Sequence, residues 1–142
     1  MRSIMILPIM ILLAAGATLP AMADTVKMTT ALTGATEVPG PGAPNGKGSA
    51  ELTFDTAKNQ VCYMLMSSGT DTPTMAHIHK GKAGVAGGVV IALTAPANGM
   101  SQGCAELPVD ALQAILHDPG DYYVNVHTAA FPKGAMRGQL GK

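Results

Sequence analysis

Residues 49–66 read SAELTFDTAKNQVCYMLM, and this stretch decides the fold class. Its first part places Ala50, Leu52 and Phe54 at alternate positions, which is the pattern of a strand with one buried face. The polar segment DTAKN then has the composition of a turn. Residues 61–66 are apolar on both faces, which indicates a second strand in the interior of a sheet.

The same alternation of short strands and Gly/Pro-rich breaks continues on both sides of this stretch. Further strands are predicted at residues 26–33, 74–79, 89–93, 103–107, 122–128 and 135–140. The β-branched content of residues 89–93 favours a buried strand. Leu112, Ile115 and Leu116 follow Pro108 at helical spacing, which predicts one short helix. About eight short strands and a single helix predict an all-β fold, an antiparallel Greek-key barrel or sandwich.

The first 23 residues have the pattern of a secretory signal peptide. Arg2 supplies the positive charge, residues 4–13 the apolar segment, and Ala21-Met22-Ala23 the small-residue cleavage site. Cleavage would leave residues 24–142 as a single domain. We therefore expect an exported protein, periplasmic or secreted and soluble, with no membrane attachment after cleavage.

The composition argues against several classes of partner. Charged residues make up 13% of the chain and the formal net charge is zero, so no basic surface for nucleic acid is expected. Aromatic residues make up only 4% and Trp is absent, which leaves few rings on which bases or sugars could stack. No nucleic-acid partner is predicted.

The chain has two cysteines, Cys62 and Cys104. In an exported protein such a pair is expected to form one disulfide, because the compartment is oxidising. The alternative, in which both act as thiolate metal ligands beside the histidines, stays open at this point. Met64 and Met66 share a face with Cys62 in a strand and are expected to pack against other side chains.

The segment MAHIHKG, residues 75–81, has the pattern of half a metal site. Alternate residues of a strand point to the same face, so His77 and His79 would project together. Met75 has the same parity, and its thioether could be an additional ligand that favours Cu(I). His127 lies on another predicted strand and could complete the site, although spacing alone does not select it. His117 is explained by its place at the C-terminal end of the helix, where a cationic ring is stabilised.

The remaining polar residues form no recognisable catalytic arrangement, and no catalytic residue is predicted. The chain lacks a nucleophile elbow, and its Gly-rich stretches lack the lysine and helix start of a phosphate loop. The carboxylates, Glu37 among them, are scattered at predicted turns, helix caps and strand ends. We expect them to be solvated charges.

Three segments together resemble the CHRD (chordin) domain. The first is Leu32 to Pro39, LTGATEVP; the second is AHIHKG from Ala76, followed by Gly88-Val89-Val90; the third is YVNVHT from Tyr123 with PKGAMRGQL from Pro132. They occur in the expected order and cover nearly all of residues 24–142. The sequence departs from the family pattern at Ala135, where glutamate is usual.

The resemblance also implies a ligand set. CHRD domains are similar in pattern to the Cu/Zn superoxide dismutase fold, where a His-x-His strand and a later histidine hold copper. By that resemblance His77, His79 and His127 are the copper ligands, and Arg137 corresponds to an arginine that steers an anion. The chain has no counterpart of the bridging histidine or of the zinc ligands. The resemblance therefore implies a mononuclear site.

Three functions are consistent with these observations. The first is copper storage, delivery or buffering, with a copper-handling protein as partner. The second is an enzyme resembling a copper-only superoxide dismutase, in which Arg137 attracts superoxide. The third is a metal-free extracellular domain with a structural or protein-binding role, in which Asn125 and Thr128 would hydrogen-bond around buried imidazoles.

Overall fold

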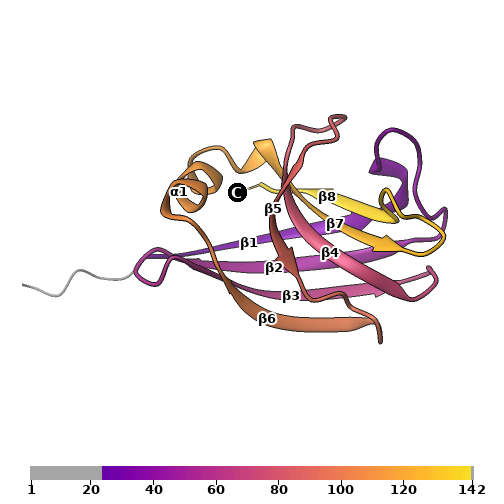
Figure 1. Cartoon of the computed structure of the whole chain (residues 1–142), viewed down its shortest axis with the longest axis horizontal. Coiled ribbons are helices and arrows are strands. Elements are labelled where there is room, and N and C mark those ends of the chain that lie inside the picture. The colour runs from indigo at the N-terminus through magenta and orange to yellow at the C-terminus, as the bar shows by residue number, and fades with distance from the viewer. Residues whose placement is uncertain (1–23, 142) are drawn as a thin grey trace, which may run out of the picture.

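The computed structural model describes residues 24–141, in which eight strands form one antiparallel sheet that curls into a nearly closed barrel (Figure 1). The all-β prediction is confirmed. The signal peptide predicted at residues 1–23 lies outside the described residues. Within the described part of the chain, no helix has the length and apolar character that crossing a membrane requires.

The elements follow the predicted order. The strands are β1 (Thr25–Thr33), β2 (Lys47–Asp55), β3 (Gln60–Ser68), β4 (Pro73–Lys80), β5 (Gly88–Leu93), β6 (Met100–Glu106), β7 (Tyr122–Thr128) and β8 (Met136–Gln139). The helices are α1 (Val109–His117) and two single 3-10 turns, η1 (Gly34–Thr36) and η2 (Pro119–Asp121). Strand β6 begins three residues before the predicted start, because Met100 already pairs with β3.

The strand order in the sheet is β5-β4-β7-β8-β1-β2-β3-β6. Strand β4 follows β3 along the chain but lies at the opposite end of the sheet, beside β5 and β7. Strand β6 then returns to pair with β3. This long crossing between antiparallel strands is the Greek-key feature that was predicted. It also brings β4 and β7, which are about 45 residues apart in sequence, into direct contact.

The core fills the inside of the barrel through the period-two pattern of its strands. Ala50, Leu52 and Phe54 on β2 are all buried, as their alternation predicted. Helix α1 packs Leu112 and Ile115 onto the same core at one end of the barrel (Figure 1). The strands are thereby held rigidly, and side chains on their outer face are presented in fixed positions.

Two expectations about burial are wrong. Strand β5 lies at an edge of the sheet rather than in its interior, and Val89 is 57% exposed. Its β-branched residues favour extended backbone, but that preference does not report which position in a sheet a strand takes. Met64 and Met66 were expected to pack, and both are exposed on the outer face of β3.

The predicted disulfide is confirmed. Cys62 on β3 and Cys104 on β6 lie directly opposite each other and are bonded. The described residues contain no free cysteine, so the alternative of thiolate metal ligands is excluded. A disulfide is consistent with an oxidising compartment outside the cytoplasm.

Candidate metal centre

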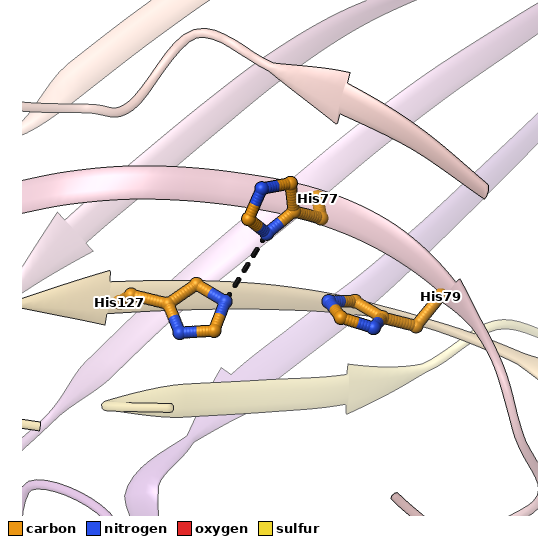
Figure 2. A group of neighbouring side chains, drawn as sticks. All are labelled: His77, His79 and His127. Atoms are coloured by element: carbon orange, nitrogen blue, oxygen red, sulfur yellow. Dashed lines mark hydrogen bonds between the residues drawn. The ribbon is translucent and has the colours of Figure 1, made fainter. Parts of the chain in front are cut away.

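The histidines lie on two neighbouring strands of the barrel. Ala76 and Ile78 of β4 point into the core, so His77 and His79 project from the outer face of the strand. His127 projects from the same face of β7, which pairs with β4 in the sheet. Figure 2 shows the three rings turned toward one another above these two strands. The sheet therefore brings together all three histidines that were predicted as ligands.

The three rings are close enough to share one ion. One nitrogen from each of His77, His79 and His127 can be chosen so that all three lie within 4.8 Å of one another. The shortest separation, 3.1 Å, is between Nδ1 of His77 and Nε2 of His127 (Figure 2). The ring centroids of His77 and His79 are 5.3 Å apart. No backbone movement is needed for a common ligand.

Two backbone carbonyls fix which nitrogens face the centre. Nδ1–H of His79 donates to the carbonyl oxygen of Gly87 at 3.0 Å, and Nδ1–H of His127 donates to that of Pro132 at 3.1 Å. A carbonyl oxygen only accepts, so both Nδ1 atoms carry the proton and both Nε2 atoms hold a lone pair. Nδ1–H of His77 then donates to Nε2 of His127.

Nε2 of His79 stands out because it is buried and has no hydrogen-bond partner. A buried polar atom without a partner is rare in folded proteins and costs about 1–3 kcal/mol. Its lone pair faces the other two imidazoles, where a cation would satisfy it. The residues present therefore fit a metal ion.

The protonation states also suit a cation. Burial lowers the pKa of all three imidazoles, and repulsion from the neighbouring histidines lowers the pKa of His77 and His127 further. For His79, burial is the largest cause, and the positive charge of Arg137 also lowers the pKa; the hydrogen bond to Gly87 raises it, but by less. The rings are therefore neutral at pH 7, and a neutral imidazole is the form that binds metals.

The loop between β4 and β5 closes over the site, where the carbonyl of Gly87 accepts the Nδ1–H of His79. The ring of His79 stacks on Tyr123 with centroids 4.9 Å apart and planes 7° from parallel. Arg137 lies against the same tyrosine, with its guanidinium carbon 3.4 Å from the ring centroid. The Tyr123 hydroxyl accepts the N–H of Gly87, whose carbonyl orients His79. Tyr123 thus positions His79 from two directions.

A family model for the CHRD domain matches residues 28–140, most of the chain. The chain belongs to the CHRD family. The resemblance based on the segments around His79, His127 and Arg137 is therefore confirmed. Neither a curated protein nor a solved structure matches this chain.

The other residues singled out in the sequence take different positions relative to the centre. Met75 lies opposite His127 in the β4–β7 ladder and is 46% exposed. His117 is at the exposed end of α1, hydrogen-bonded to Asp118, and does not belong to the three-histidine group of this CHRD domain.

Arg137 and Asn125 are buried. The Arg137 guanidinium donates to the carbonyls of Lys82 and Val85 and to the side-chain oxygen of Gln139, so its N–H groups hold the loop rather than face solvent. The Asn125 amide donates to Glu37 and to the carbonyl of Met136, and its hydrogen bonds do not go to the imidazoles.

Glu37 is the residue that sequence reasoning missed. It was expected to be a solvated charge, but it is 8% exposed and accepts a hydrogen bond from Asn125. Its carboxylate occupies the space where a side chain on Gly134 would lie, and Gly134 has a φ of 145° that only glycine adopts easily. The one signal in the sequence was its place in the opening segment of the family pattern.

Burial raises the pKa of Glu37 to about 7, although the Val38 N–H, Arg137 and Asn125 each favour the charged form. The folded CHRD domain therefore binds this proton more tightly than the unfolded chain does. Its contribution to stability is present below about pH 4.5, the ordinary value, and is lost as the pH rises through about 7.

Glu37→Gln should accordingly raise the free energy of unfolding by about 2 kcal/mol at pH 8 and change it little at pH 5. Urea denaturation at the two pH values measures the difference. Glu51→Gln, which removes an exposed carboxylate, is the control and should shift neither value by more than a few tenths of a kcal/mol. Equal effects of Glu37→Gln at both pH values would contradict the prediction.

Proposed function

We propose that this CHRD domain binds one copper ion through Nδ1 of His77, Nε2 of His79 and Nε2 of His127. The observation that carries the proposal is the buried Nε2 of His79, which has no hydrogen-bond partner and faces two further imidazole nitrogens. Among residues 24–141 this is the one group of three or more His, Cys, Asp or Glu side chains arranged for a metal. A single ion is therefore the stoichiometry at this site.

The donor set supports copper over most other metals. Neutral imidazole suits copper, zinc, iron and nickel, whereas magnesium and calcium prefer oxygen ligands. Among the divalent metals of the first row, copper binds nitrogen sites most tightly. The family resemblance of the His-x-His strand points to the same metal. Zinc is the competitor that a binding experiment must include.

The chain's own residues prepare the site for exchange of the ion. Gly87 and Pro132 hold His79 and His127 in the tautomer that presents Nε2. His77 needs one change, because its Nδ1 proton must move to Nε2 or leave before Nδ1 can bind metal. His77 is also the most exposed of the three rings, which gives a partner protein access to the ion.

These features support copper storage, delivery or buffering in the periplasm or outside the cell, with the ion as cargo. A copper-handling protein would be the exchange partner. The second function, superoxide turnover, gains no support from Arg137, since its N–H groups are committed to the loop. The signal-peptide pattern and the disulfide support the exported location.

The test is a competition titration of Cu(II), Cu(I) and Zn(II) into the purified protein and into the His77→Ala/His79→Ala variant. Loss of a group that only orients a ligand lowers metal affinity 10–100-fold, so loss of two ligands should lower copper affinity at least about 100-fold. His117→Ala is the matched control and should leave the affinity unchanged. Equal Cu(II) affinity of the double variant and the parent protein would contradict the proposal, and a parent protein that binds none of the three ions would favour a metal-free structural role.

A further inference from the structure

The outer face of β3 and β6 carries an unusual concentration of sulfur. Met64, Met66 and Met100 are 37%, 50% and 54% exposed. In the paired part of the two strands, five of the eight outward positions are sulfur-containing: Cys62, Met64, Met66, Met100 and Cys104, the other three being Gln60, Gln102 and Glu106. Packing into the barrel does not explain these methionines, because their side chains point away from it.

The ladder holds two of the methionines at the closest cross-strand spacing. Met66 lies directly opposite Met100. The next pair along, Ser67 and Gly99, is a hydrogen-bonded pair, since the Ser67 N–H donates to the Gly99 carbonyl at 2.9 Å. Pairs alternate in an antiparallel ladder, so Met66 and Met100 form a non-hydrogen-bonded pair, in which side chains approach most closely.

The disulfide supports this assignment independently. Cys62 lies four residues from Met66 along β3 and pairs with Cys104, so it belongs to the same class of close pair. The two Cα atoms of the disulfide are 3.9 Å apart. The two cysteine sulfur atoms are close enough to form a covalent bond. Met66 and Met100 form the equivalent pair, where the backbones of β3 and β6 approach each other in the same way.

Met64 brings a third thioether to the same place. It lies diagonally across from Met100. Diagonal neighbours in an antiparallel ladder are typically about 7–8 Å apart, against about 5 Å between the Cβ atoms of a direct pair. A methionine side chain has three rotatable bonds and places its sulfur well beyond Cβ, so three thioethers can converge between the strands. On the other side of β3, Glu51 lies opposite Met64 and adds a carboxylate beside the cluster.

We propose that Met64, Met66 and Met100 form a second metal site, made of thioethers alone, that binds a soft monovalent cation of the Cu(I) class. Thioether sulfur is a soft, uncharged donor and selects Cu(I), whereas Zn(II) and Cu(II) are bound well by imidazole. The disulfide keeps both thiols out of the site, so no thiolate is present to bind Zn(II). The paired strands hold the three methionines in register, so no loop has to become ordered when a cation binds.

This site is separate from the histidine centre. The histidines are on β4 and β7 and the methionines on β3 and β6, with no residue shared; β8, β1 and β2 lie between β7 and β3, and β5 lies between β4 and β6 where the barrel nearly closes. The two sites would therefore take cations that differ in softness, and either could exist without the other.

The experiment uses the protein with ¹³C-labelled methionine methyl groups, titrated with Ag(I), a redox-inert substitute for Cu(I), and then with Cu(I). The methyl signals of Met64, Met66 and Met100 should move together and saturate at one equivalent, while those of the buried Met28 and Met136 stay fixed. The triple variant Met64→Leu/Met66→Leu/Met100→Leu should no longer bind this one equivalent of metal. Its Cu(I) affinity at the outer face of β3 and β6 should be at least 100-fold weaker, while its Zn(II) affinity should stay within twofold of that of the parent protein.

The same titration in the His77→Ala/His79→Ala variant tests the methionine site independently of the histidine centre. The methyl signals of the three methionines should still respond to Ag(I) in that variant, so loss of the histidine site does not affect this test. Unchanged Cu(I) stoichiometry in the triple leucine variant would overturn the proposal. Methyl shifts that depend on protein concentration without metal would also overturn it, because the face would then pair two copies of the chain.

Discussion

Replacing both cysteines of the Cys62–Cys104 disulfide with alanine is expected to lower the free energy of unfolding by about 4 kcal/mol. The bond joins residues 42 positions apart, and closing a loop of this length restricts the unfolded chain by about that amount in the chain-entropy description. It also fastens β6, the edge strand, to β3, its partner in the ladder. Urea denaturation of the oxidised parent and the variant measures the loss.

Both cysteines lie on the outer face, so alanine leaves no cavity in the core. Reduction of the parent protein with a thiol should reproduce the loss, and the same thiol should have no effect on the alanine variant. Gln102→Ala, at an outward position of β6 between the methionine and the cysteine, is the matched control and should cost less than about 0.5 kcal/mol. A loss below 1 kcal/mol after removal of the disulfide would contradict the prediction.

The strands could be predicted because their signal is local. Alternation at Ala50, Leu52 and Phe54 fixes the inner face of β2 whatever its neighbours are. The position of a strand in the sheet is a tertiary property, and Val89 shows the consequence. Its side chain favours a strand equally at an edge and in the centre, so the composition of β5 did not reveal that it lies at the edge.

The candidate site divides in the same way. The parity of His77 and His79 on one strand is a local property and sufficed to place both rings on one face. The identity of the third histidine ligand depends on which strand lies beside β4. Sequence spacing alone could not decide between His117 and His127. The family resemblance favoured His127, and the β4–β7 ladder provides the physical reason.

The contacts made by polar side chains were the least predictable. Glu37 was expected in solvent because carboxylates usually lie there, yet it accepts a hydrogen bond from Asn125, 88 residues away in sequence. Arg137 was expected to face an anion, and it instead holds the loop over the histidines. Both outcomes depend on partners that only the folded chain brings together.

Arg137→Met is expected to lower the free energy of unfolding by about 3 kcal/mol and copper affinity by about 10-fold or more. The arginine is 2% exposed, donates to the carbonyls of Val85 and Lys82 at 2.7 and 2.8 Å, and stacks on Tyr123. Its loss breaks three charge-assisted hydrogen bonds and a cation–π contact. It also leaves the carboxyl of Glu37 without its nearby positive charge.

The effect on copper follows from the chain of contacts. The loop that Arg137 holds contains Gly87, whose carbonyl fixes the tautomer of His79, and loss of such an orienting group typically costs 10–100-fold in metal affinity. Arg137→Lys should keep the charge near Glu37 but lose the fork of donors, and so restore only part of the stability. Lys27→Met removes an exposed cation elsewhere on the sheet and should change neither quantity. If Arg137→Met weakened folding and left copper affinity at the parent value, the loop would not position His79.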